Sequence, residues 1–124
     1  MKLVTFALAG AVASLPFAAL ADGASETVTA QTHAQLAAGA SDLAGVHMHL
    51  HHTVNCLVGP GGKGFDAKEM NPCANAGNGA IPDTKDPARL KVLNDAVVLA
   101  ESGISDDDLT AARKAASDTA NMLK

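Results

Sequence analysis

Apolar residues recur every three or four positions in two separate stretches of the chain, which is the spacing of amphipathic α-helices. The first stretch predicts a helix from Ser25 or Thr27 to about Ala38 and a second helix over 43–57. Asp42 precedes the second helix as an N-cap, because its carboxylate can accept a hydrogen bond from a free amide of the first turn.

The last stretch predicts a second pair of helices. Asp86 is expected to cap a helix that has Pro87 at its first position and ends at Ser102-Gly103. Ser105, followed by three aspartates, predicts the N-terminus of a final helix that runs to about Leu123.

The two stretches look like copies of one helical hairpin. Asp42-Leu43 matches Asp108-Leu109, and residues 53–57 match residues 119–123 at the same spacing. A doubled hairpin folds most simply as a four-helix bundle, so we expect an all-α domain built from two hairpins joined by a long loop. The alternative is a three-helix bundle in which the first helix continues through Gly39.

Residues 1–21 have the order of a secretory signal peptide. Met1 and Lys2 precede an apolar run that ends in Ala19-Leu20-Ala21, and cleavage is expected after Ala21. The run is short for a membrane span and contains Pro16. We therefore expect residues 22–124 to be a periplasmic or secreted domain that makes no membrane contact once the signal is removed.

The segment that joins the hairpins, residues 58–85, is rich in Gly and Pro and lacks periodicity. A loop of this length is uncommon in a compact domain unless it is functional, tied down or disordered. Cys56 and Cys73 are the only two cysteines, and an even number in an exported chain favours a disulfide. Their spacing fits neither a CxxC redox motif nor a CxxCH haem motif, so we expect a structural disulfide. Metal ligation by the cysteines is the alternative.

Charge and composition disfavour several classes of function. The chain has 9 Lys and Arg against 13 Asp and Glu, and a net charge of −4, which disfavours nucleic acid and anionic membranes as partners. Phe65 is the only aromatic residue after the signal, so base stacking and aromatic ligand cages are nearly excluded. An enzyme is not expected, because the chain lacks an HExxH motif, a nucleophile motif and a phosphate-binding loop.

Four of the five histidines lie between positions 47 and 52. At about 100° per residue on a helix, His47 and His51 flank the apolar stripe as an i, i+4 pair. Two imidazoles at this spacing commonly bind a transition metal from one helix face. We therefore expect His47 and His51 to be the main ligands. The predicted accessory ligands are His52, His49, His33 from the preceding helix, and Met48, whose thioether would shift the preference toward cuprous copper. Copper is therefore expected before zinc or nickel.

The hairpin repeat, the His-bearing helix and the sequence Leu99-Ala-Glu-Ser-Gly103 before Asp107-Asp-Leu109 resemble the small, His-rich metal-binding proteins of the bacterial periplasm. This resemblance implies a four-helix bundle that sequesters or carries a transition metal, copper first. Arg113 and Lys114 stand where the repeat would place His47 and Met48, so the second hairpin is expected to be a support.

Two other functions stay open. One is binding of haem or another small ligand inside the bundle, with His47 beside the core as an axial ligand. A haem pocket normally has bulky walls, however, and this core is rich in Ala. The other is an interaction protein that uses the 58–85 loop to dock on a protein partner, with Phe65, Met70 and Ile81 as anchors.

Overall fold

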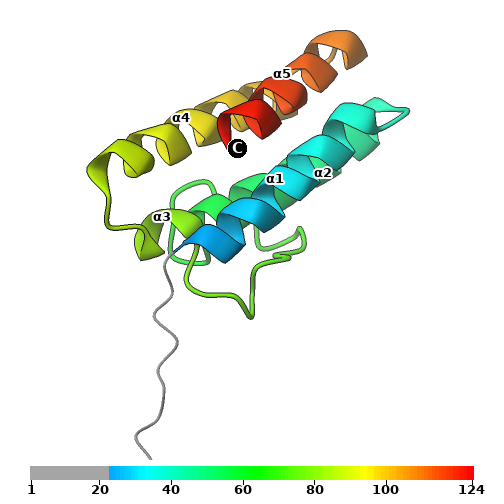
Figure 1. Ribbon diagram of the computed structural model, residues 1–124. Helices are drawn as coiled ribbons and strands as arrows, with labels where there is room; N and C mark the ends of the chain where they lie inside the picture. Colours follow the sequence, from blue (N-terminus) through cyan, green and yellow to red (C-terminus); the bar gives the residue numbers. More distant parts are fainter. Residues whose placement is uncertain (1–22) are drawn as a thin grey trace, which may run out of the picture.

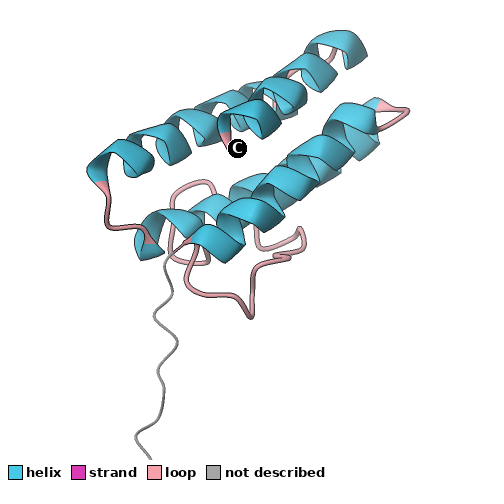
Figure 2. Cartoon of the chain, in the orientation of Figure 1, coloured by secondary structure: helices cyan, strands magenta, loops and turns pink. Residues whose placement is uncertain are grey.

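The computed structural model describes residues 23–124, in which every regular element is a helix (Figures 1 and 2). The absence of strands from this part of the chain confirms the all-α prediction. The predicted signal peptide and its cleavage position lie outside the described residues. The helices are α1 Ala24–Gly39, α2 Leu43–Val58, α3 Ala80–Asp83, α4 Pro87–Ile104 and α5 Leu109–Met122.

The four long helices pack as two neighbouring pairs around an Ala- and Leu-rich core. Helix α1 contacts α2 and α5, and α4 also contacts α2 and α5, so each long helix has two main neighbours (Figure 1). Leu50 of α2 and Leu93 of α4 are fully buried between alanines of the other helices. None of the described helices is long and apolar enough to cross a membrane.

The helix starts follow the predicted caps at two of four positions, Asp42 and Asp86, whereas α1 begins after Gly23 and not at Ser25 or Thr27. The Asp42 carboxylate accepts a hydrogen bond from the Gly45 amide at 2.7 Å, and Asp86 caps α4 in the same way. Because α1 ends at Gly39 and α2 begins after this cap, the three-helix alternative with one continuous first helix is wrong.

The predicted start of the final helix is also wrong by one turn. Helix α4 continues to Ile104, and the Ser105 hydroxyl donates to the carbonyl of Glu101 at 3.1 Å instead of capping α5. The cap is Asp108, whose carboxylate accepts from the Ala111 amide at 2.7 Å. Asp106 and Asp107 therefore belong to the turn between the helices.

The long segment between the hairpins is tied to α2 by the predicted disulfide. Cys56 and Cys73 are bonded to each other, with their Cα atoms 5.1 Å apart, so metal ligation by the cysteines is wrong. Both are buried in the core. The segment is not wholly irregular as predicted, because it contains the single helical turn α3.

Candidate metal site

Three histidines meet where α1 packs against α2. His33 comes from α1, and His49 and His52 come from α2; one nitrogen of each lies within 4.8 Å of the other two. The Nδ1 atoms of His33 and His49 are 3.4 Å apart. In a tetrahedral site with metal–nitrogen bonds of about 2.0 Å, ligand nitrogens lie about 3.3 Å apart. One edge of the His33–His49–His52 triad therefore already has the separation that a bound ion requires.

The position of the triad follows from how α1 and α2 face each other. Ala30, Ala34 and Ala37 form a fully buried stripe on α1, and their small side chains let the two helices approach closely. On α2, the Thr53 hydroxyl lies 3.3 Å from the carbonyl oxygen of Ala30, directly across this interface. His33 lies one turn after Ala30, and His49 lies one turn before Thr53. The two helices therefore bring these imidazoles side by side.

The environment of His33 and His52 favours their neutral imidazoles, the form that binds metals. Burial lowers the pKa of His33, and the neighbouring His52 and His49 lower it further. Burial also lowers the pKa of His52, as do His49 and His51, while Glu69 acts in the opposite direction. The three rings are 5.1–5.6 Å apart between centroids, close enough for a charge on one ring to oppose a charge on the next.

His52 is the most deeply buried member of the triad. Only 4% of the residue is exposed, and its Nδ1 has no hydrogen-bond partner in the described chain. A buried polar nitrogen without a partner costs roughly 1–3 kcal/mol. A metal ion held by the triad would give this nitrogen a partner.

The two histidines that the sequence placed first lie outside the triad. His47 donates from Nε2 to the carbonyl of Asp106 at 2.9 Å, at the turn between α4 and α5. His51 faces the long loop, where its Nδ1 lies 3.7 Å from a carboxylate oxygen of Asp66. Met48 is 41% exposed and is not a member of the triad either. The face of α2 that forms the triad with α1 is the one that carries His49 and His52.

The helical-wheel argument chose His47 and His51 as the main ligands because they flank one apolar stripe, which faces the core. Helix α2 is in fact covered on more than one side, because His52, Thr53, Asn55 and Cys56 are buried as well as the stripe. The sequence signal that identifies the triad is the alanine stripe of α1, which shows where the hairpin closes. His33, predicted only as an accessory ligand, lies beside that stripe.

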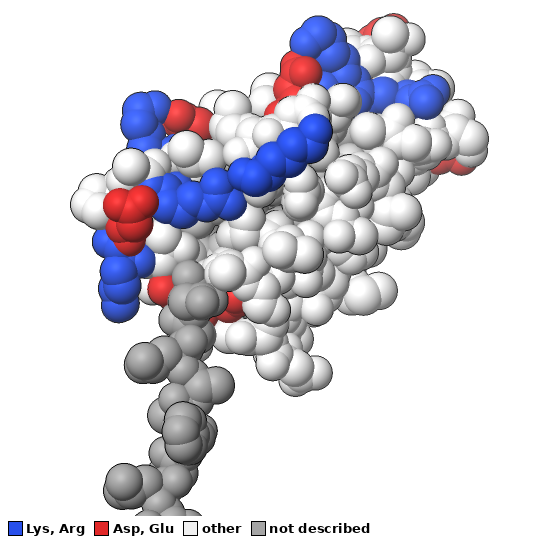
Figure 3. All heavy atoms as spheres, in the orientation of Figure 1, with Lys and Arg blue, Asp and Glu red and all other residues white. Residues whose placement is uncertain are grey.

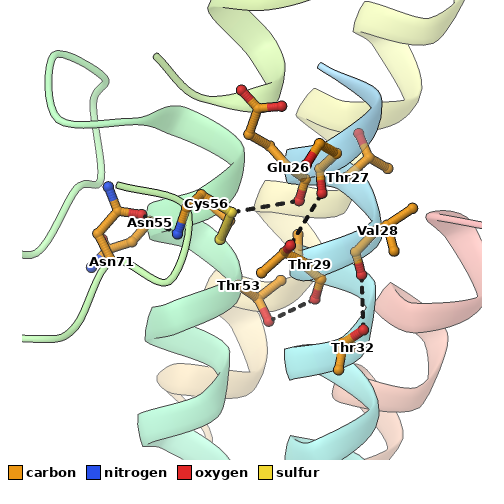
Figure 4. The surroundings of a disulfide bond; sticks show 12 residues. Glu26, Thr27, Val28, Thr29, Thr32, Thr53, Asn55, Cys56 and Asn71 are labelled. Carbon is orange, nitrogen blue, oxygen red and sulfur yellow. Dashed lines mark hydrogen bonds between the residues drawn. A yellow bond between two sulfur atoms is a disulfide. The ribbon is translucent and has the colours of Figure 1, made fainter. Parts of the chain in front are cut away.

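Sequence reasoning also missed the carboxylates that the long loop brings to α2. The buried Asn55 side chain holds this part of the loop: its Nδ2 donates to the carbonyls of Asp66 at 2.9 Å and Met70 at 3.1 Å, and its Oδ1 accepts from the Asp66 amide at 2.8 Å. Figure 4 shows Asn55 on the loop side of α2, next to the disulfide at Cys56. As a result, the carboxylate of Glu69 lies 3.7 Å from Nε2 of His52.

Comparison with known proteins identifies no relative that shares this geometry. No protein-family model, no curated protein and no solved structure matches the chain. Metal binding is therefore argued from the triad itself.

Proposed function

We propose that this protein binds a transition-metal ion between α1 and α2 through His33, His49 and His52, on the scaffold of a four-helix bundle. The observation that carries the proposal is the convergence of three imidazole nitrogens within 4.8 Å, from two helices, at a half-buried position. Surface histidines without a role have no reason to converge across a helix interface, where their mutual repulsion on protonation lowers stability.

Three neutral imidazoles suit Cu²⁺, Zn²⁺ and Ni²⁺. Copper is the ion that we expect first, because nitrogen sites generally bind Cu²⁺ most tightly among the divalent first-row metals. The thioether argument for copper carries less weight, since Met48 lies outside the triad. Three protein ligands leave a coordination position open for water or for a donor from another molecule, which suits exchange of the ion rather than permanent storage.

The proposed role is sequestration or carriage of the ion outside the cytoplasm. The apolar start of the chain and the resemblance to small periplasmic metal-binding proteins both support this location. The Cys56–Cys73 disulfide supports it independently, because disulfides persist in oxidising compartments.

The test is a titration of the purified protein, with its disulfide intact, by Cu²⁺, Zn²⁺ and Ni²⁺ under native mass spectrometry and calorimetry. We expect one tightly bound ion in the wild type and none at comparable affinity in the His33→Ala/His49→Ala variant. The matched control is His47→Ala/His51→Ala, which also removes two histidines but leaves the triad. Equal binding by the wild type and the triad variant, or loss only in the control, would contradict the proposal.

A protein partner at the 58–85 loop remains the second candidate, supported by one observation. An open hollow of about 760 Å³ lies beside the loop and is lined by Val58, Ile81 and Pro82 among others. Of the three predicted anchors, Phe65 and Ile81 are partly buried against the core, whereas Met70 is exposed. The haem alternative is less well supported, because the ring of His47 is engaged with the carbonyl of Asp106.

A further inference from the structure

The long loop presents two carboxylates to two adjacent histidines of α2. Glu69 lies 3.7 Å from Nε2 of His52, and Asp66 lies 3.7 Å from Nδ1 of His51. Both carboxylate side chains are 34% exposed. The two pairs differ in one respect: His52 belongs to the triad and His51 does not. Any special role for a loop carboxylate at the metal site therefore falls to Glu69.

The position of Glu69 is fixed by covalent and hydrogen-bond constraints on both sides. Asn55 holds the backbone at Asp66 and at Met70, the residue that follows Glu69. A few residues later, Cys73 is bonded to Cys56, which is the neighbour of Asn55 on α2. The loop is thus fastened to the helix turn that follows His52. A carboxylate held this way loses little conformational freedom when it engages the imidazole.

Permanent charge is scarce on the two helices that form the triad. Glu26, in the first turn of α1, is the only Asp, Glu, Lys or Arg residue in either helix. In Figure 3, charged side chains gather over the part of the molecule formed by α4 and α5, while the part formed by α1 and α2 is largely uncharged. With so few charges on these two helices, a loop carboxylate beside His52 has a large influence on an ion at the triad.

We propose that Glu69 is the carboxylate partner of the metal site and positions His52 for coordination. This inference rests on the proposed function. Nε2 of His52 faces the Glu69 carboxylate at 3.7 Å, so the carboxylate favours the tautomer with the proton on Nε2 and the lone pair on Nδ1, the buried nitrogen that has no hydrogen-bond partner in residues 23–124. Nδ1 is then the nitrogen that coordinates the ion. A carboxylate behind a ligating imidazole fixes its tautomer and raises its basicity.

The same arrangement favours a divalent ion over a monovalent one. The Glu69 carboxylate offsets part of the charge that a bound ion brings into a half-buried site, and this offset grows with the charge of the ion. We therefore infer that the physiological ligand class is a divalent borderline metal, Cu²⁺ or Zn²⁺, and that Cu⁺ gains less from Glu69.

The decisive comparison is between Glu69→Gln and Asp66→Asn. Each variant removes one loop carboxylate without changing its size, at the same distance from a histidine of α2. Partners of this kind typically contribute 10–100-fold to metal affinity. We expect Glu69→Gln to weaken Zn²⁺ binding by about 10-fold or more, and Asp66→Asn to bind within about threefold of wild type. Calorimetry with Zn²⁺, repeated with Cu²⁺ and with Cu⁺ under anaerobic conditions, measures the difference.

A second readout distinguishes the positioning of His52 by Glu69 from a purely structural role of Glu69. Imidazole ¹⁵N shifts of the zinc-loaded protein identify which nitrogen of His52 is coordinated, and we expect Nδ1 in the wild type. Coordination through Nε2, or equal affinity of wild type and Glu69→Gln, would overturn the role of Glu69 while leaving the triad intact. If the wild type binds no ion at all, the proposed function fails first, and this inference fails with it.

Discussion

Asp83 shows how one side chain secures the region that follows the long loop. Its buried carboxylate accepts hydrogen bonds from the backbone amide of Asn78 at 2.7 Å and from the side-chain amide of Asn78 at 3.1 Å. The amide of Asn78 is the main reason why the pKa of Asp83 is lowered, and a hydrogen bond with the Glu26 side chain adds to it. The ionised form of Asp83 is therefore the one that stabilises the fold.

The sign of the pH dependence follows from this shift. Because the folded-state pKa lies below the unfolded value of 3.8, the stabilisation is complete at higher pH and is lost as the pH falls from about 3.8 through the folded-state pKa. We expect Asp83→Asn to lower the free energy of unfolding at pH 7 by about 1–2 kcal/mol, the cost of a lost charge-assisted hydrogen bond. Urea denaturation at pH 7 and at pH 3 measures it. A difference between variant and wild type that stays the same at both pH values would contradict this account.

At the level of single residues, the sequence predicted the type of residue that forms the candidate site better than it predicted which residues form it. The concentration of histidines on one helix was visible, and five of the six proposed ligands are histidines that the structure describes. Which three converge depends on the antiparallel packing of α1 on α2, and a wheel drawn for one helix contains no information about its neighbour. The role of Glu69 was out of reach for the same reason, since only the folded loop brings it to His52.

Close packing between helices puts a specific demand on Gly103 of α4. A Cβ atom added there would lie 2.6 Å from Cδ1 of Leu50 on α2 and 3.1 Å from Cβ of Ala115 on α5. Leu50 is fully buried and has little space to move. We expect Gly103→Ala to lower the free energy of unfolding by about 1–2 kcal/mol, because the cost of overpacking exceeds the gain in helix propensity.

The matched control is Gly39→Ala at the end of α1. A Cβ atom at this position meets nothing within 4 Å, and the residue does not have a positive φ. We expect this substitution to be neutral or to stabilise by up to about 1 kcal/mol, since alanine restricts the unfolded chain. Thermal unfolding of both variants measures the contrast. Similar melting temperatures for the two variants would show that the helices do not approach closely at Gly103.

Whole helices were predicted well because their signals are local. Asp42 and Asp86 accept hydrogen bonds from amides within one turn, and Pro87 has a fixed φ that suits the first helical position, so these effects can be read from the sequence. Ser105 and Asp108 are alternative N-caps for α5. Which of them caps the helix depends on how far α4 continues, and the length of α4 is set by its packing. The turn α3 was missed because four residues show no periodicity. The disulfide could be predicted because the chain has two cysteines and its apolar start favours export.

The disulfide acts on the molecule as a whole, because it closes a loop between residues 17 positions apart and fastens it to the core. The chain-entropy estimate for a loop of this length is about 3 kcal/mol. We expect the Cys56→Ser/Cys73→Ser variant to lose about this amount of unfolding free energy, measured by urea denaturation. A loss below about 1 kcal/mol would mean that Asn55 and its hydrogen bonds hold the loop without help.

The proposed metal binding would be coupled to global stability, because the triad exists only when α1 and α2 are packed together. His33 is separated from His49 by the end of α1, a turn and the start of α2, so the unfolded chain has no preformed site. A ligand that binds only the folded state stabilises it by about 2.7 kcal/mol at a free concentration of one hundred times Kd. We therefore expect Zn²⁺ or Cu²⁺ to raise the melting temperature in a concentration-dependent way that a chelator reverses.

His49→Ala should abolish this shift in melting temperature, whereas His51→Ala should keep it. Each variant removes one imidazole from α2, but only His49→Ala breaks the triad. An equal shift in both variants would mean that the ion stabilises the protein from elsewhere on its surface.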